Sequence, residues 1–260
     1  MPAKSLNLAN ARVLISNDDG INAPGLKLME SILMKMAREV WVVAPETEQS
    51  GTSHSLTLRR PLRIRKVSTH RYAVDGTPTD SVLMGISKLM RDMPPDIVIS
   101  GVNRGANIGE DVTYSGTVAA AMEGTLLGIP SIAFSQVYTT GNPVKWATAN
   151  KWAPKILGMI CAEAWPSGVL INVNFPDLIA TRVTGIEFTR QGQRKIGSEY
   201  VSGLDPRGEP YYWIGAQRRE ERYYRGSDLE AIQRGAISVT PLSMDLTHSP
   251  TLKKMRNLYK

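Results

Sequence analysis

Three short segments of the sequence are rich in oxygen-bearing side chains and poor in cysteine and histidine. Each one follows a short apolar run: residues 17–20 (NDDG), 46–51 (ETEQSG) and 101–109 (GVNRGANIG). Carboxylate, hydroxyl and amide oxygens are hard ligands that suit Mg²⁺, Mn²⁺ or Ca²⁺ better than Zn²⁺. Because like charges repel, the adjacent Asp18 and Asp19 need a cation or a proton between them. The residue types favour a divalent-cation site, and the alternative is an ordinary turn beside a solvated carboxylate.

A fourth segment, residues 114–121 (YSGTVAAA), places the hydroxyls of Ser115 and Thr117 on either side of Gly116 where a helix is expected to begin. The first turn of a helix has unpaired N–H groups and a partial positive charge, so it can bind phosphate. The plainer interpretation is a serine N-cap followed by small residues that pack closely on a sheet. Both interpretations stay open on the sequence alone.

Several well-known site motifs are missing from the sequence. It has no G-x-x-x-x-G-K-[ST] P-loop, no G-x-G-x-x-G after the first apolar run and no G-x-S-x-G elbow. These absences argue against a P-loop NTPase, a dinucleotide cofactor and an acyl hydrolase.

The elements that must position these segments alternate between strand and helix. Strand-length apolar runs separated by helical patterns predict an α/β fold, with a mostly parallel sheet that helices cover on both faces. Such sheets bind ligands at the carboxyl ends of their strands, so the three loops should converge at one edge. Strands are expected at 12–16, 41–44, 96–100, 129–135 and 169–173, and helices at 26–36, 78–90, 116–128 and 145–164.

The remaining segments are less regular. Alternating residues over 54–74 predict two or three half-exposed antiparallel strands, and residues 181–225 resemble hairpins. Thr77-Pro78-Thr79-Asp80 has the cap and the first-turn proline of a helix start. The chain is expected to form one domain over 1–260 with an irregular arm. Beyond the hairpins we expect a helix at 226–234, a strand at 236–242 and a helix at 251–259.

Composition sets limits on the class of protein. The chain has 260 residues, of which 42% are hydrophobic and 21% charged, as in ordinary globular proteins. Its one cysteine, Cys161, excludes a disulfide framework and is expected to be a buried, inert thiol. No signal-peptide core and no membrane-length apolar run is visible, so we expect a cytoplasmic protein without membrane contact.

The net charge of +7 allows nucleic acid or small anions as partners. The basic residues gather at 59–66 and 253–260, where they are not interleaved with aromatic residues. Base-stacking surfaces combine the two types, so a solvated basic face is the preferred interpretation and nucleic acid is not expected as the main partner.

Taken together, the segments resemble the SurE family, the metal-dependent survival-protein phosphatases that act on nucleoside monophosphates. The similarity spans about residues 12–242, and the block around YSGTV is its most specific part. The matching blocks are VLISNDDGINAPG, VVAPETEQSG, VDGTPTDSV, PDIVISGVNRGANIGEDVTYSGTVAAAMEG, GIPSIAFS, LINVNFP and GSDLEAIQRGAISVTPL.

The resemblance implies a Rossmann-like core that holds one divalent cation, Mg²⁺ or Mn²⁺, in a site that Ca²⁺ can also occupy. By motif position the cation ligands are Asp18, Asp19, Ser50 and Asn103. Phosphate is expected on the cation and on the segment that includes Asn107, Ser115, Gly116 and Thr117. Asp18 and Asp19 are the expected catalytic residues, with Asp19 preferred for activating water. Asn17 and Asn107 are expected to orient water or phosphate.

The implied activity is hydrolysis of nucleoside 5′- and 3′-monophosphates by an activated water, without a covalent intermediate. Family members are usually dimers or tetramers, which implies that the arm (194–225) and the tail (246–260) reach across subunits. His54 is either a proton donor to the leaving group or a surface residue. The aromatic residues of the arm either pack the arm or stack on a nucleobase. Two other functions stay open: a non-catalytic nucleotide or phosphate sensor, and a nucleic-acid-binding protein.

Overall fold

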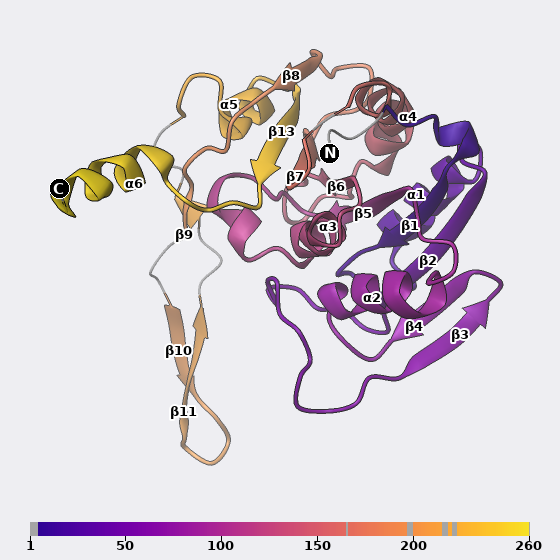
Figure 1. Cartoon of the computed structure of the whole chain (residues 1–260). Helices are drawn as coiled ribbons and strands as arrows, with labels where there is room; N and C mark the ends of the chain where they lie inside the picture. Colours follow the sequence, from indigo (N-terminus) through magenta and orange to yellow (C-terminus); the bar gives the residue numbers. More distant parts are fainter. Residues whose placement is uncertain (1–4, 165, 197–199, 215–217, 220–222, 260) are drawn as a thin grey trace.

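A nine-stranded sheet forms the centre of the molecule in the computed structural model, which describes residues 5–164, 166–196, 200–214, 218–219 and 223–259 (Figure 1). Its strands are β1 (Arg12–Ser16), β2 (Glu39–Pro45), β3 (Ile64–Ser68), β4 (Arg71–Val74), β5 (Ile97–Arg104), β6 (Ser131–Gln136), β7 (Val169–Phe175), β8 (Ile186–Phe188) and β13 (Ile237–Ser243).

The strand order is β3-β4-β2-β1-β5-β6-β7-β13-β8. All neighbours from β4 to β7 are parallel, and β8 is parallel to β13. The other two neighbouring pairs of this sheet, β3 with β4 and β13 with β7, are antiparallel. The prediction of a mostly parallel α/β sheet is therefore confirmed.

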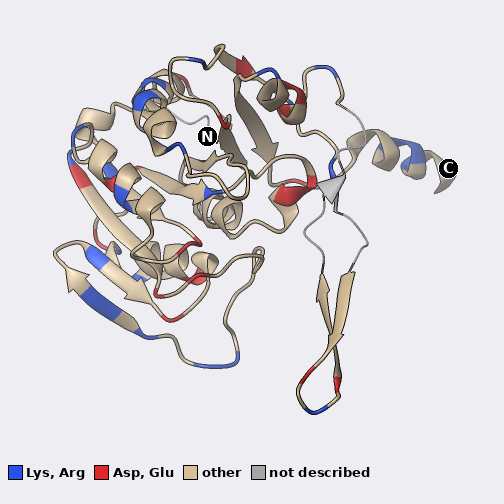
Figure 2. Ribbon diagram, turned by 180° about the vertical axis from the view of Figure 1, so that it is seen from behind, with Lys and Arg blue, Asp and Glu red and all other residues tan. Residues whose placement is uncertain are grey.

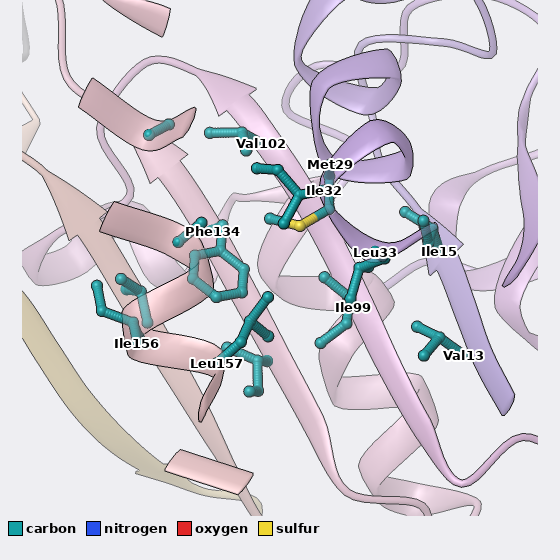
Figure 3. Packing of buried hydrophobic residues seen from close by; sticks show 14 of the residues in the cluster. Val13, Ile15, Met29, Ile32, Leu33, Ile99, Val102, Phe134, Ile156 and Leu157 are labelled. Carbon is teal, nitrogen blue, oxygen red and sulfur yellow. The ribbon is translucent and has the colours of Figure 1, made fainter. Parts of the chain in front are cut away.

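Helices cover both faces of this sheet. On one face, Met29 and Leu33 of α1 point toward Ile99 of β5 (Figure 3). On the other face, Leu14 of β1 packs in a cluster with Val82 of α2. Neighbouring residues of a strand point to opposite faces, so continuously apolar strands supply both cores. The helices are α1 (Pro24–Leu33), α2 (Pro78–Met84), α3 (Gly116–Leu126), α4 (Trp146–Ala162), α5 (Asp228–Gln233) and α6 (Ser249–Arg256), with short turns at Leu8–Asn10, Gly85–Leu89, Gly109–Thr113 and Asn257–Tyr259.

The start of α2 follows the prediction, whereas the segment before it follows the prediction only in part. Thr77 and Asp80 form a capping box at the helix start. Two antiparallel strands, β3 and β4, form within 54–74 as predicted, but residues 54–63 form no strand, so the prediction was wrong there. Side chains take up part of the hydrogen bonding there, because the Thr57 N–H donates to Asp80 Oδ1 at 3.0 Å.

The predicted arm contains a hairpin that projects from the body of the molecule (Figure 1). Its strands β10 (Tyr200–Leu204) and β11 (Pro210–Ile214) pair antiparallel, and a second short pair joins β9 (Lys195–Ile196) to β12 (Arg218–Arg219). All five residues of β11 are exposed. The remaining parts of the arm prediction, 197–199, 215–217 and 220–222, lie outside the described residues, as does residue 260 of the tail.

The two basic clusters lie on different sides of the molecule. Figure 2 shows Lys and Arg on the edge strand β3 and on α6, far from each other. They do not form one continuous basic surface. Among the helices that the structure describes, none is long and apolar enough to cross a bilayer.

Candidate active site

The loops that follow the parallel strands line one cavity at the carboxyl edge of the sheet. This cavity has a volume of about 480 Å³. Asp18 after β1, Ser50 after β2 and Asn103 at the end of β5 all line it, as does Ser115 before α3. The convergence expected from a parallel sheet is thus present, and it brings together residues that lie up to 97 positions apart in the sequence.

Of the two predicted aspartates, Asp18 is the more deeply buried, with 5% of its surface exposed. The hydroxyl of Thr117 donates a hydrogen bond to its Oδ1. Burial raises the pKa of Asp18 to about 6; the Thr117 hydrogen bond opposes this rise and the charge of Asp19 adds to it. The site therefore holds a carboxylate whose negative charge is poorly compensated by the protein itself.

Asp19 is less deeply buried and faces the end of β5. Its Oδ2 accepts a hydrogen bond from the backbone N–H of Arg104 at 3.1 Å. Burial raises the pKa of Asp19, the Arg104 N–H lowers it, and the nearby charge of Glu48 raises it further. Two adjacent carboxylates with raised pKa values thus lie at the end of β1, an arrangement that a cation would stabilise.

Ser50 lies on a loop that is fastened to its neighbours on both sides. The backbone N–H of Gln49 donates to the carbonyl oxygen of Asp18 at 2.7 Å, and the Ser53 hydroxyl donates to the carbonyl oxygen of Thr113 at 2.7 Å. The Ser50 hydroxyl itself donates to Glu48 Oε1 at 2.8 Å. Donation leaves the hydroxyl oxygen with lone pairs for a cation.

The side-chain amides of Asn103 and Asn17 each donate to a backbone carbonyl two or three residues further along the chain. Asn103 Nδ2 donates to the carbonyl oxygen of Gly105 at 3.2 Å, and Asn17 Nδ2 donates to that of Gly20 at 3.0 Å. Gly20 has a φ of +92°, which favours glycine, and the chain bends at Asp18 and Asp19. Asn17 Oδ1 is buried and has no hydrogen-bond partner among the described residues, which leaves an acceptor beside the aspartates.

Asn107 is held in place by two asparagines of β7. Its N–H donates to Asn174 Oδ1 at 2.8 Å, and its carbonyl oxygen accepts from Asn172 Nδ2 at 2.7 Å and Asn174 Nδ2 at 3.0 Å. Its own Nδ2 donates to the Ser135 hydroxyl at 2.8 Å. This buried network fixes the glycine-rich loop against the sheet.

The start of α3 packs directly on Asp18. Ser115 is the N-cap, and its hydroxyl accepts the Val118 N–H at 3.0 Å. A Cβ on Gly116 would lie only 2.8 Å from the Cβ of Asp18, so glycine is required there for close approach. The Thr117 side chain is fully buried and faces Asp18. The N-cap interpretation holds for Ser115, and the role of Ser115, Gly116 and Thr117 in phosphate binding stays a prediction.

Two residues whose roles were considered above, His54 and Cys161, do not line the cavity. His54 Nε2 lies 2.9 Å from Glu123 Oε2 on α3, and His54 does not line the cavity. This geometry favours the surface interpretation over a proton donor. Cys161 is buried, and burial raises the pKa of its thiol to about 12, as expected for an inert cysteine.

The chemistry of the donor set fits a hard cation. In the part of the chain that the structure describes, no three His, Cys, Asp or Glu side chains are grouped closely enough to hold a metal ion. A cation here would need serine and asparagine oxygens beside the two aspartates. The predicted set of Asp18, Asp19, Ser50 and Asn103 has this composition.

Known proteins resemble the chain over nearly its whole length. The family model described as survival protein SurE matches residues 13–198. The chain belongs to the SurE family. A 5′-nucleotidase SurE of Paramagnetospirillum magneticum is 62% identical over 251 residues, which are 96% of each chain. Another, from Parvibaculum lavamentivorans, is 55% identical over 249 residues, covering 95% of this chain and 90% of the relative. The crystal structure of the SurE protein from Aquifex aeolicus superimposes with a TM-score of 0.83 at 40% identity, covering 96% of this chain and 100% of that one.

Some residues of this SurE-family site were missed on the sequence. Asn172 and Asn174 gave a signal, since two asparagines interrupt an otherwise apolar strand, and buried polar groups are hydrogen-bonded. Asp228 is a third residue that was not identified from the sequence. Its carboxylate accepts the N–H groups of Gly109 at 2.9 Å and Gly192 at 2.8 Å, so it joins the glycine-rich loop to the segment that leads into the arm.

Proposed function

We propose that this SurE-family chain is a divalent-cation-dependent phosphomonoesterase that hydrolyses nucleoside 5′- and 3′-monophosphates to nucleoside and phosphate. The observation that carries the proposal is the buried carboxylate of Asp18, which shares a cavity with Ser50 and Asn103 beside the start of α3. The relatives named 5′-nucleotidase SurE support the same activity for this chain.

Asp18, Asp19, Ser50 and Asn103 would hold the cation. All four offer oxygen, and the raised pKa of Asp18 indicates a charge that lacks a positive partner. When bound, such an ion polarises phosphoryl oxygens and lowers the pKa of a water molecule. The fit rests on Mg²⁺ and Mn²⁺ preferring oxygen ligands.

The chain's own groups have distinct tasks in the reaction. The N-terminal end of α3, which begins at Gly116, carries partial positive charge, and this charge stabilises negative phosphoryl oxygens in the transition state. Asn107, held rigidly by β7, orients the phosphate or the attacking water. Asp19 accepts the proton of that water as a general base.

The bond changes are those of a direct displacement. The water oxygen attacks phosphorus, the bond between phosphorus and the ester oxygen breaks, and the nucleoside leaves with the ester oxygen. The proton lost by water goes to the Asp19 carboxylate, and the leaving alkoxide takes a proton from solvent. No covalent enzyme intermediate is needed.

The test is phosphate release from a panel of nucleoside monophosphates with Mg²⁺ or Mn²⁺, with and without a chelator. We expect turnover that chelation abolishes and added cation restores. Full activity in excess chelator would overturn the metal assignment. Saturable nucleotide binding without turnover would indicate a sensor instead, and affinity for nucleic acid that falls steeply with salt would indicate a nucleic-acid-binding protein.

We further propose that the chain forms a homodimer or homotetramer through its arm and tail. Trp213 and Ile214 on β11 are 70% and 85% exposed, although both are large and apolar. Leu252 and Met255 of α6 are exposed as well, and no described residue of that helix is buried. Contiguous exposed apolar side chains of this kind usually mark an interface.

A further inference from the structure

The cavity offers more room than a phosphate group needs. Its volume of about 480 Å³ lies within the range of roughly 300–1,000 Å³ that is common for small organic ligands. Asp18, Ser50 and Asn103 line the part proposed to hold cation and phosphate. Arg104 and Tyr138 also line the cavity, and neither side chain is among the proposed cation or phosphate ligands.

Strand pairing brings Arg104 and Tyr138 together. Arg104 ends β5 and is in register with Gln136 at the end of the neighbouring β6. The N–H of Gly105 donates to the carbonyl oxygen of Gln136 at 3.0 Å, which holds the two strand ends together as they enter their loops. Tyr138 follows two residues later, and the guanidinium carbon of Arg104 lies 5.1 Å from the centre of its ring.

Arg104 also connects this pair to the proposed reacting groups. The backbone N–H of Arg104 donates to Asp19 Oδ2 at 3.1 Å, while its side chain lies over Tyr138. The charge of Arg104 lowers the pKa of Asp19, but the guanidinium forms no ion pair with a carboxylate of the described residues. The side chain is exposed, so its planar group is accessible to a ligand that enters the cavity.

We propose that Arg104 and Tyr138 form a stacking platform for the nucleobase of the substrate, an inference that rests on the proposed nucleotidase function. Guanidinium planes and aromatic rings are the groups on which proteins stack unpaired bases. A nucleoside monophosphate has its anionic group at one end and a flat π-system at the other, and the cavity is lined both by the proposed site residues Asp18 and Asn103 and by this pair. Every base has a π-face, so the platform should tolerate different bases.

The experiment compares substrates with and without a base. We would measure kcat/KM for adenosine and uridine 5′-monophosphates and for ribose 5-phosphate, which has the same sugar phosphate but no base. The variants are Tyr138→Leu, Tyr138→Phe and Arg104→Met, with Phe188→Leu as a control for an exposed aromatic residue on the distant edge strand β8.

We expect Tyr138→Leu to lower kcat/KM for both nucleotides by about 5- to 100-fold, the range expected for loss of base–aromatic stacking. The value for ribose 5-phosphate should fall far less. Tyr138→Phe keeps the ring and should retain most of the nucleotide activity, and Arg104→Met should show the same selective loss as Tyr138→Leu. Phe188→Leu should leave kcat/KM unchanged for the nucleotides and for ribose 5-phosphate.

Two results would overturn the platform. Equal losses for nucleotides and ribose 5-phosphate would mean that the pair positions Asp19 or binds phosphate, and unchanged nucleotide activity in Tyr138→Leu would mean that the base lies elsewhere. Failure of the proposed function is distinct, because the wild-type protein would then release phosphate from none of these substrates. In that case calorimetric binding of adenosine monophosphate against ribose 5-phosphate decides the platform by the same comparison.

Discussion

Replacing Asp18 with asparagine is expected to stabilise the folded protein when no cation is present. Burial raises the pKa of Asp18 from 3.8 to about 6, so near neutral pH the fold holds an ionised carboxylate that would be better solvated in the unfolded chain. At about 1.4 kcal/mol for each pKa unit, this difference corresponds to roughly 3 kcal/mol. Asparagine has the same shape without the charge, and its Oδ1 can still accept the Thr117 hydroxyl.

The sign of the pH dependence follows from the raised pKa. A carboxyl group with a raised pKa in the fold favours the folded state below its unfolded pKa of 3.8, and this contribution is lost as pH rises to about 6. The advantage of Asp18→Asn should therefore be near zero at pH 4 and reach roughly 3 kcal/mol above pH 6.5. Asp228 titrates in both proteins, so its contribution largely cancels in the difference, whereas loss of the Asp18 charge removes its repulsion with Asp19 and adds to the gain.

The assay is urea unfolding of both proteins in chelator at pH 4, 5, 6 and 7.5, followed by thermal unfolding at pH 7.5 with added Mn²⁺. Wild type should gain stability from Mn²⁺ and Asp18→Asn should gain little, because a ligand stabilises only the state that binds it. The variant should also lose turnover. A pH-independent difference, or an Asp18→Asn protein that is less stable than wild type at pH 7.5, would refute the reasoning that burial leaves this charge uncompensated.

Three further predictions concern the groups around the site. Thr117→Val removes the hydroxyl that donates to Asp18, so the pKa of Asp18 should rise further. The Mn²⁺ affinity measured by calorimetry should then weaken more at pH 6 than at pH 8, and an equal loss at both pH values would contradict this. Asn174→Leu leaves the buried N–H of Asn107 without an acceptor, so it should lower the free energy of unfolding by about 1–3 kcal/mol. It should also lower kcat with little change in metal affinity, and an unchanged kcat would remove Asn107 from the mechanism. Replacing residues 200–214 with a short Gly-Ser linker should shift the mass measured by light scattering to a smaller species, and an unchanged oligomer or a monomeric wild type would count against the arm as an interface.

Structure could be predicted from the sequence where local pattern determines it. Apolar runs and helical spacing predicted the parallel core, and Thr77 with Asp80 marked the start of α2 because a capping box depends on residues three positions apart. The same local reasoning failed for residues 54–63. Alternation there predicts a strand, but no neighbouring strand pairs with the segment, and pairing is a tertiary event.

For the candidate site, the sequence determined which oxygen-bearing residues follow the strands, and a parallel sheet requires such loops to meet at one edge. Contacts between side chains of distant segments could not be read in this way. The Thr117 hydroxyl donates to a carboxylate 99 positions away in the sequence. Asn174 holds Asn107 from a strand that lies two places along the sheet. Tyr138 lies beside Arg104 because Gln136, two residues before Tyr138, is in register with Arg104. Loop residues carry no periodic signal of their own. Their partners are decided by strand register and by how closely a helix packs on the sheet, and only the folded chain establishes these.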